Sequence, residues 1–413
     1  MIRSLSMTRR NLVRLALAAP VAATFSRLRA FAAPLANKVK ITAVKAMQIR
    51  GIAGNCLIRI DTDAGLTGYG EAGVTGPMAR ARIETMKQYL IGRDPMAIEV
   101  HFSNLTSLMH TYMANIPTIS GIDMALWDLA GKITGQPVSS LLGGPFREEI
   151  RLYSHGVGMN MLDKASCKAF AERVKAQPEG FTTFKCDIHG PLGLPMGRFA
   201  GTLDGAQIRK VAQAYQNARE ALGDEIEIGV HCHNEFDLPS SLAIAKAVEP
   251  INPVFYEDPL NPPFSDAWLG LRRGTRLAIL TGEKLELVQG FKPFVDHQVA
   301  DIIHPDLAFC GGFTGAKKIA DYAALARIPV ALHNVGSLVL CYANAHFGGS
   351  IQNFYRSENA LGRPTRYIEG MAAGAPPEVK NSHLKVPTGA GLGLEINPDF
   401  LKKNLVAGEE FWS

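Results

Sequence analysis

Four polar residues end short apolar runs in the second half of the chain. Glu257, Glu283, Asp306 and His333 each follow such a run, and helix-like sequence separates one run from the next. A parallel β/α barrel brings the carboxyl ends of its strands to one face and carries its chemistry there. We therefore expect these four side chains to be neighbours in space.

An even spacing extends this series to one more strand end. His231, Glu257 and Glu283 follow one another at intervals of 26 residues. Polar side chains on consecutive strand ends of a barrel converge on one point, which is how a barrel builds a divalent-metal site. A single acid at a strand end is more often a surface charge, but the repeat favours a metal site.

Asp306 and His333 lie at the next two strand ends. An aspartate beside a histidine accepts a hydrogen bond from the imidazole, selects its tautomer and raises its basicity. A lone histidine is more often structural, but this one has a partner. The pair therefore predicts a general base that faces the metal.

Two predicted domains position these residues. The segment 39–63 alternates polar and apolar residues and precedes turn glycines, which indicates an antiparallel sheet. Three helix-like segments follow, and the third is expected to begin at Ser120 or Asp123 and to end at Gly131 or Gly135. The barrel then follows, with eight strand-like runs at 151–156, before Asp187, before His231, at the four positions above, and within 346–355. A glycine- and proline-rich loop, 189–205, is expected to serve as a functional cover.

The charge of the chain is concentrated at its N-terminus. The first 33 residues carry six arginines and no acid, which leaves 37 of the 43 basic residues against 38 acidic ones. This balance argues against a nucleic-acid or anionic-lipid surface in the body of the protein. The pair Arg9 and Arg10, followed by a short apolar run, resembles a twin-arginine signal peptide over 1–33 and predicts a periplasmic location. The run is too short to span a membrane. The alternative is a disordered basic tail.

Several motifs resemble the mandelate-racemase branch of the enolase superfamily. They are GLTGYGE, SGIDMALWDLAGK, LLGGPFR, PTGAGLG and the strand-end series itself. FKCD, His233 and NFYRSE are similar to features of the sugar-acid dehydratases that act on galactonate or mannonate. The resemblance implies an α/β fold, with an α+β capping domain over 38–150, a modified (β/α)7β barrel over 151–375 and a C-terminal segment, 376–413, that returns to the cap. It also implies a closed homo-oligomer.

The resemblance assigns a role to each candidate residue. It implies a lyase that abstracts the proton next to a carboxylate and eliminates water from a sugar acid. Glu257, Glu283 and the residue at position 231 would hold one Mg²⁺ ion. His333 with Asp306 would take the proton, His233 would protonate the departing hydroxyl, Lys185 would neutralise the carboxylate, and Asp187 and Glu358 would contact the substrate.

The chain departs from the family pattern at two of these positions. His231 stands where the family has a metal-binding aspartate, and Mg²⁺ is rarely held by imidazole. His231 could bind Mn²⁺, Fe²⁺ or Zn²⁺ instead, or Glu235 or Asp187 could supply the missing oxygen. Asp187 also replaces the second lysine of the family's pair, which argues against a racemase that uses this lysine as a base.

Two other functions stay open at this stage. His233 and His333 come from opposite sides of the barrel, so a racemase, epimerase or cycloisomerase could use the same first half-reaction. The change at His231 also allows a sugar-acid binding protein without catalysis. Such a protein, however, has no need of a catalytic histidine with an aspartate partner.

Overall fold

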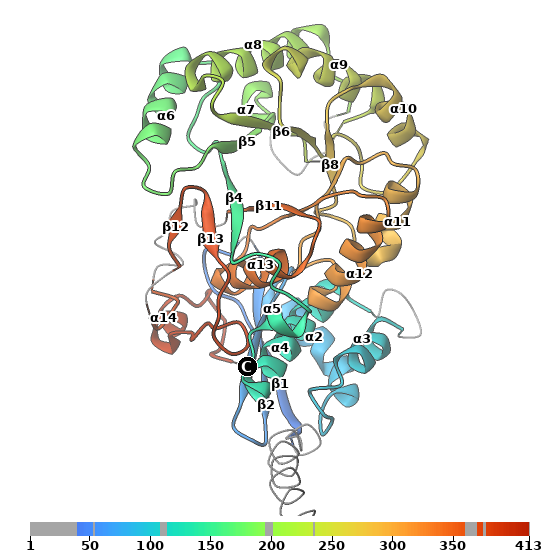
Figure 1. The fold of residues 1–413 in the computed structure, drawn as a ribbon, viewed down its shortest axis with the longest axis vertical. Coiled ribbons are helices and arrows are strands. Elements are labelled where there is room, and N and C mark those ends of the chain that lie inside the picture. The colour runs from blue at the N-terminus through green and yellow to red at the C-terminus, as the bar shows by residue number, and fades with distance from the viewer. Residues whose placement is uncertain are drawn as a thin grey trace, which may run out of the picture.

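The computed structural model describes residues 39–52, 54–107, 114–194, 201–233, 236–359, 370–374 and 377–412. A ring of strands and helices lies above a smaller body that contains the first three strands (Figure 1). The proposed signal peptide, 1–33, and Glu235 lie outside the described residues. No helix in the described ranges is both long and apolar enough to cross a bilayer.

The smaller body is an antiparallel sheet covered by helices. Its strands are β1 (Ile41–Met47), β2 (Cys56–Thr62) and β3 (Thr67–Ala72), in the order β1-β2-β3. Its helices are α2 (Gly76–Met86), η2 (Lys87–Tyr89), α3 (Ile98–Thr106), α4 (Ile116–Thr134) and α5 (Val138–Leu141). Helix α4 lies very close to β3, because a Cβ atom at Gly70 would stand only 2.0 Å from the carbonyl oxygen of Gly121. The GLTGYGE motif therefore supplies the space into which α4 packs.

Helix α4 begins earlier than the sequence predicted. Its N-cap is Asn115, whose side chain accepts a hydrogen bond from the Thr118 amide, and it ends at Gly135 in the left-handed conformation. The predicted end at Gly135 is confirmed, whereas a start at Ser120 or Asp123 is wrong. These two polar residues misled the prediction because they cap a different helix, as described below.

The second body is a closed barrel of eight parallel strands. They are β4 (Glu149–His155), β5 (Thr183–Asp187), β6 (Glu227–His231), β7 (Phe255–Glu257), β8 (Ile279–Thr281), β9 (Ile302–Ile303), β10 (Val330–Leu332) and β11 (Phe354–Glu358). Strand β11 pairs in parallel with β4 and closes the ring. The predicted barrel with an α+β capping domain is confirmed.

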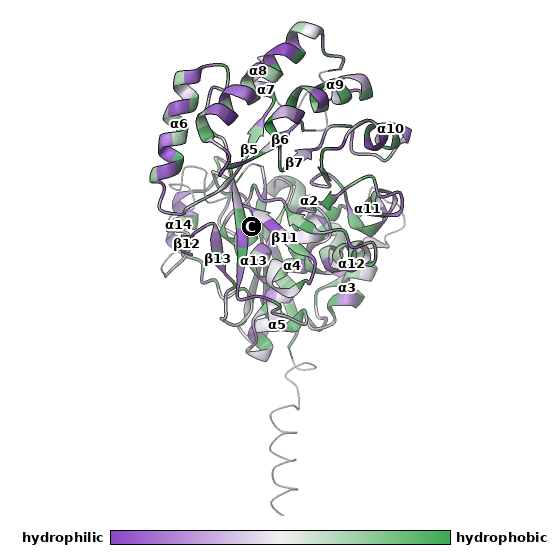
Figure 2. Cartoon of the chain, turned by 45° about the horizontal axis from the view of Figure 1, so that its top comes forward, coloured by the Kyte–Doolittle hydropathy of each residue, from purple (hydrophilic) through white to green (hydrophobic). Residues whose placement is uncertain are grey.

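Helices connect successive strands around the barrel. They are α6 (Lys164–Ala176), α7 (His189–Leu192), α8 (Gly205–Leu222), α9 (Leu238–Val248), η4 (Glu249–Ile251), α10 (Asp266–Gly274), α11 (Leu287–Asp296), α12 (Gly312–Leu325) and α13 (Leu338–Ser350). Helices α6 and α8 show both purple and green along their length in Figure 2, as expected for helices with one face on the strands and one in solvent. Among the described residues, β11 is followed by short strands at 379–380 and 383–385 before the next helix, at 398–403, which agrees with a (β/α)7β barrel.

The last barrel strand lies later than predicted. Residues 346–350 belong to α13, and β11 begins only at Phe354. The sequence analysis placed Gly348 and Gly349 in a strand-like run, but in the structure they lie in α13 and allow close packing. A Cβ atom at Gly348 would stand 2.7 Å from the Phe354 ring, and one at Gly349 would stand 2.8 Å from Val386.

The barrel interior consists of layers. An apolar layer forms a separate buried cluster, made of Tyr153, Phe255, Leu280, Ile302 and Ala331. Successive inward positions on a strand are two residues apart, so the next inward residues lie above this layer at the carboxyl ends. The apolar layer is therefore the floor of any site at that end.

The capping domain binds the barrel at two helix N-termini. Ser120 accepts a hydrogen bond from the Gly311 amide and Asp123 accepts one from the Thr314 amide, at the start of α12. Glu71, which is fully buried, accepts hydrogen bonds from the amide and the hydroxyl of Ser337 at the start of α13. Carboxylates are favourable at helix N-termini because free amides and the helix dipole are directed at them.

The C-terminal segment contacts both bodies. Its strands β12 (Val379–Lys380) and β13 (His383–Lys385) form a hairpin, and β13 pairs antiparallel with β4. Further along, the Leu392 amide donates to Asp128 of α4. The last helix, α14 (Pro398–Lys403), lies before Asn404, whose carbonyl accepts from the Arg50 amide.

Candidate active site

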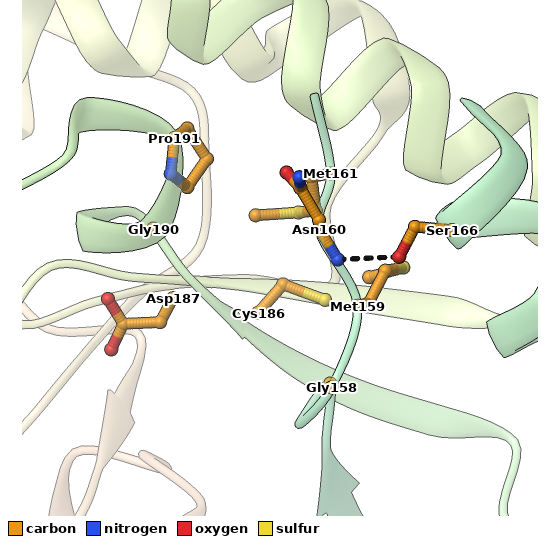
Figure 3. A pocket seen from close by; sticks show the side chains of 10 residues that line it. Gly158, Met159, Asn160, Met161, Ser166, Cys186, Asp187, Gly190 and Pro191 are labelled. Atoms are coloured by element: carbon orange, nitrogen blue, oxygen red, sulfur yellow. Dashed lines mark hydrogen bonds between the residues drawn. The ribbon is translucent and has the colours of Figure 1, made fainter. Parts of the chain in front are cut away.

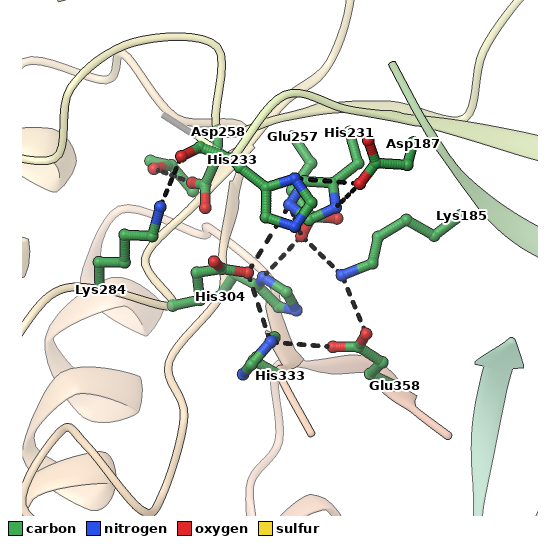
Figure 4. A network of polar contacts seen from close by, with 12 residues as sticks. Lys185, Asp187, His231, His233, Glu257, Asp258, Lys284, His304, His333 and Glu358 are labelled. Atoms are coloured by element: carbon green, nitrogen blue, oxygen red, sulfur yellow. Dashed lines mark hydrogen bonds and ion pairs between the residues drawn. The ribbon is translucent and has the colours of Figure 1, made fainter. Parts of the chain in front are cut away.

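Nine residues singled out by sequence lie on one face of the barrel. They are Lys185, Asp187, His231, His233, Glu257, Glu283, Asp306, His333 and Glu358, and each lies at or just past the carboxyl end of a strand. Figure 4 labels seven of them, together with the neighbours Asp258, Lys284 and His304, in one network of polar contacts. The barrel topology thus unites residues that are up to 173 positions apart in the chain.

Four of the polar side chains at this face form a group with metal-ligand geometry. One donor atom from each of His231, Glu257, Asp258 and Glu283 lies within 4.8 Å of the others. His231 Nε2 is 3.4 Å from a Glu257 oxygen and 3.8 Å from a Glu283 oxygen. All four residues are buried.

The donor atoms of this group suit a cation. His231 Nε2, Glu257 Oε2, Asp258 Oδ2 and Glu283 Oε2 are buried, and none has a hydrogen-bond partner among the described residues. Buried carboxylate oxygens without donors are costly, because desolvation is not offset. A divalent cation would compensate three carboxylates and accept the lone pair of the imidazole.

The protonation states agree with this interpretation. Burial lowers the pKa of His231 well below its usual value, and the positive charge of Lys185 lowers it further. The imidazole is therefore neutral, which is the form that binds metals. Burial and the nearby Glu283 carboxylate raise the pKa of Asp258 to about 6. Repulsion among these acids is relieved by protons or by a cation.

Asp306 and His333 form a buried hydrogen-bonded dyad. His333 Nδ1 lies 2.6 Å from Asp306 Oδ2, and the other Asp306 oxygen accepts from the Ala308 amide. His333 Nε2 is directed at the site, 3.4 Å from Glu283 and 3.5 Å from Glu358. Burial alone would lower the pKa of His333, but the carboxylates of Glu358 and Glu283 and the bond to Asp306 raise it to about 10.

The loop that carries His333 is held from three sides. Asn344 of α13 donates to the His333 carbonyl, and the Asn334 amide donates to Glu358. Glu71 of the capping domain holds the end of this loop at Ser337. The base is therefore positioned by the capping domain as well as by the barrel.

Lys185 links the metal-ligand group to Glu358. Its ammonium lies 2.9 Å from both Glu257 and Glu358. Burial alone would lower the pKa of Lys185, but these carboxylates raise it, so the side chain is charged. His155 contacts the same Glu358 oxygen as Lys185 does.

A second carboxylate and imidazole cluster adjoins the first. Asp187 Oδ1 lies 2.6 Å from His189 Nδ1, and Asp187 Oδ2 lies 3.0 Å from His233 Nδ1. Burial alone would raise the pKa of Asp187, but the hydrogen bonds from these two imidazoles lower it. The rings of His233 and His231 are tilted by 33° to one another with centroids 3.7 Å apart, so the cluster contacts the metal-ligand group.

Both halves of the chain match models of one enzyme family. Residues 32–143 match the N-terminal domain of mandelate racemase/muconate lactonizing enzymes, and residues 167–400 match the enolase C-terminal domain-like family. The chain belongs to the mandelate racemase/muconate lactonizing enzyme family. It is thus a member of the enolase superfamily, as its motifs indicated.

Relatives within this family include sugar-acid enzymes. D-xylonate dehydratase from Haloferax volcanii is 32% identical over 90% of each chain. D-galactarolactone cycloisomerase from Agrobacterium fabrum is 28% identical over 84% of this chain and 89% of its own. Among solved structures, a mandelate racemase/muconate lactonizing enzyme-like protein from Rubrobacter xylanophilus has a TM-score of 0.81 and 29% identity, over 91% of this chain and 99% of its own.

The sequence analysis missed two residues of this site, Asp258 and His189, which lie close in the sequence to predicted ones. Asp258 directly follows Glu257 in the sequence, and two adjacent acids at a strand end were the signal that could have identified it. His189 lies two residues after Asp187, in a segment expected to be loop. Asp187 itself is not in the metal-ligand group, because both of its oxygens face histidines.

A cavity of about 520 Å³ adjoins Asp187 on the outer side of β5 (Figure 3). It is lined by the loop after β4, the start of α6, the end of β5 and α7, including Gly156, Gly158, Met159, Asn160, Met161, Ser166, Cys186, Asp187, Gly190 and Pro191. Asp187 thus stands between this cavity and His233.

Proposed function

We propose that this protein is a metal-dependent hydro-lyase that removes water from a sugar acid to give a 2-keto-3-deoxy acid. The observation that carries the proposal is the Asp306 and His333 dyad, whose Nε2 atom faces the carboxylates of the candidate metal group. A proton next to a carboxylate is weakly acidic, so its removal needs both a base and positive charge near the carboxylate. The dehydratase relative supports water loss as the outcome.

The dyad and Lys185 would carry the first half of the reaction. His333 Nε2 takes the C2 proton when the imidazole is neutral, because Nδ1 is already engaged by Asp306. A cation held by Glu283 would offset one of the carboxylate charges that raise the pKa of His333. The buried ammonium of Lys185 stabilises the negative charge that develops on the substrate carboxylate. The acids that contact Lys185, Glu257 and Glu358, are also buried. Glu358, which contacts Lys185 and the loop of His333, orients both groups.

His233 would carry the second half. As the C3–O bond breaks, His233 gives a proton to the departing oxygen, which leaves as water, and the electron pair from C2 forms the C2=C3 bond. The resulting enol then tautomerises to the keto acid. Asp187, which the sequence placed at the substrate, instead contacts His233 in the structure.

The proposed metal is a divalent ion held by His231, Glu257, Asp258 and Glu283. When bound, it would supply an electrophile for the substrate carboxylate. Three acids favour Mg²⁺ as in the family, but the imidazole of His231 favours Mn²⁺, Fe²⁺ or Zn²⁺. Elemental analysis and calorimetry of the purified protein test both the stoichiometry and the preferred ion.

Racemisation, epimerisation or cycloisomerisation is a second candidate. His233, just past β6, and His333, just past β10, flank the candidate metal group, and two bases on opposite sides of C2 would suit such reactions. The cycloisomerase relative supports the same alternative.

Product analysis in heavy water tests the proposal. A panel of five- and six-carbon aldonates would be incubated with the wild type and with His333→Asn, and the products followed by NMR and mass spectrometry. Formation of 2-keto-3-deoxy acid by the wild type alone supports the dehydratase. Deuterium uptake at C2 without keto acid in any member of the panel would reject it in favour of the second candidate.

We also propose export through the twin-arginine route and assembly into a homo-oligomer. The arginine pair Arg9 and Arg10 before an apolar run supports the first. Cell fractionation of the wild type beside a variant with both arginines changed to lysine tests export, and light scattering of the purified protein tests assembly.

A further inference from the structure

Asp187 holds two imidazoles through its two oxygen atoms. Oδ1 accepts from His189 twice, from Nδ1 at 2.6 Å and from the backbone amide at 2.8 Å. Oδ2 lies 3.0 Å from Nδ1 of His233. His189 thus holds one oxygen of the carboxylate in place, and the second oxygen faces His233.

We propose that Asp187 and His189 are positioning residues that orient His233 as the proton donor to the leaving hydroxyl. The inference rests on the proposed function and deepens it. It assigns the site two acid and histidine pairs with separate tasks, one for proton removal at C2 and one for loss of the hydroxyl at C3.

The two pairs have a similar arrangement, with a shorter and better aligned contact in the base dyad. In the base dyad, the acid follows β9 and the histidine follows β10, and the acid engages Nδ1 at 2.6 Å. In the second pair, Asp187 ends β5 and His233 follows β6, and the acid again faces Nδ1. An acceptor at Nδ1 places that proton and leaves Nε2 as the atom that exchanges a proton with substrate.

The backbone of His233 is strained, and other groups hold it. Its φ of 52° lies in the left-handed region, which a residue with a Cβ atom rarely adopts. Such strain persists only where the surroundings determine the conformation, and it is frequent at functional sites. Lys284 donates to the His233 carbonyl, and the His233 ring packs against the His231 ring at a tilt of 33°. The imidazole is therefore held at the edge of the metal-ligand group.

His189 is needed because Asp187 has room to move. The Asp187 side chain retains 33% of its exposure and lines the cavity of Figure 3, whereas that of His189 retains only 3%. The ring of His189 also stacks against Phe236. Without the two bonds from His189, the carboxylate could turn toward the cavity and leave Nδ1 of His233 without its acceptor.

The geometry distinguishes an orientation role from substrate binding. His189 is buried and donates to the Asp187 oxygen that does not face His233, and its ring also contacts the His233 ring edge-on, with centroids 5.1 Å apart. His189 therefore supports His233 both through Asp187 and by direct packing. Its loss should affect the step at C3 and spare the step at C2, since the base dyad has its own acceptors.

The test uses His189→Ala beside His189→Asn in the full-length protein. Asparagine keeps a donor near the position of Nδ1, whereas alanine has none. We expect the alanine variant to lose about 10²-fold in kcat for dehydration, within the range for general acid–base catalysis, with KM little changed. The asparagine variant should recover most of this loss. Asp187→Asn, which keeps the side-chain volume, should resemble the alanine variant.

A second readout separates orientation from general damage. In heavy water, unreacted substrate should still gain deuterium at C2 in His189→Ala, because His333 is intact. The matched control is His101→Ala, which removes a buried imidazole from the capping domain, bonded only to the Asp94 carbonyl in the described contacts. The control should keep wild-type kcat.

Several outcomes would overturn the inference. Wild-type dehydration by His189→Ala, or an equal loss of exchange and dehydration in that variant, excludes the orientation role. Release of a second metal equivalent by His189→Ala would show that Asp187, His189 and His233 bind metal instead, since their donor atoms also lie within 4.8 Å of one another. Absence of dehydration by the wild type refutes the proposed function itself, which is a different result.

Discussion

Replacement of Glu71 should weaken both the fold and the catalytic base. The Glu71 carboxylate is fully buried and accepts from three donors, the Ser337 amide, the Ser337 hydroxyl and the Asn55 side chain. A hydrogen bond to a charged group contributes about 1.5–3 kcal/mol, and buried donors left without an acceptor add a penalty. Because such terms are not additive, we expect Glu71→Ala to lower the free energy of unfolding by about 3–5 kcal/mol.

The same substitution should lower kcat, because Ser337 ends the loop that begins at His333. Glu71→Gln keeps one acceptor oxygen but loses the charge at the N-terminus of α13, so it should cost about 1–2 kcal/mol. Urea unfolding followed by circular dichroism measures the stability, and steady-state kinetics measure kcat. Both are made on the same purified samples.

Asp128→Asn is the matched control. Asp128 is also a buried carboxylate of the capping domain and accepts from the Tyr69 and Leu392 amides and from Lys132, but among the described residues it makes no hydrogen bond or ion pair with the loops of the base dyad. It should lose stability with little change in kcat. The reasoning fails if Glu71→Ala unfolds like a surface variant, or if Asp128→Asn lowers kcat as much as Glu71→Ala does.

Three further predictions follow from the buried polar groups. His346 is neutral because Nδ1 accepts from the Ser139 amide and Nε2 donates to the Leu392 carbonyl, and burial lowers its pKa to about 4. Its contribution to stability is complete above pH 6.5 and is lost as the pH falls toward 4, by about 3 kcal/mol, so urea midpoints should fall more steeply over this range in the wild type than in His346→Phe. His231→Asp should raise the affinity for Mg²⁺ relative to Mn²⁺ at least about tenfold in calorimetry, because it replaces an imidazole by a hard oxygen donor, and an unchanged ratio would show that His231 is not a ligand. Asp306→Asn should lower kcat by about 10²- to 10⁴-fold with a small change in KM, as expected when a base loses the acceptor that selects its tautomer, and a change under twofold would contradict the dyad.

The sequence was sufficient for the features that depend on local pattern. Apolar runs ending in Glu257, Glu283 and the two dyad residues predicted both the barrel and the convergence of these side chains. The reason is geometric, since parallel strands in a closed barrel place all their carboxyl ends on one face. That conclusion did not require knowing which of these side chains contact one another or at what distances.

Local pattern failed where a residue serves a distant element. Ser120 and Asp123 suggested the start of a helix, but they lie within α4 and cap α12, 191 residues away. Gly348 was expected in a strand-like run, but it lies in α13 and makes space for the Phe354 ring. A polar residue indicates that a hydrogen-bond partner is present, and a glycine indicates that another group packs closely. Only the tertiary structure shows which residue is that partner or neighbour.

The sequence by itself determined the family, the barrel and the strand-end residues of the candidate site, because these follow from periodicity and motif. The tertiary structure alone decided that Asp258 joins the metal-ligand group, that Asp187 faces His189 and His233, and that Glu71 holds the loop of the base. Each of these depends on the direction in which a side chain leaves its strand or loop, and on the neighbours that burial brings to it. Such directions are set by packing between distant segments, which no local pattern specifies.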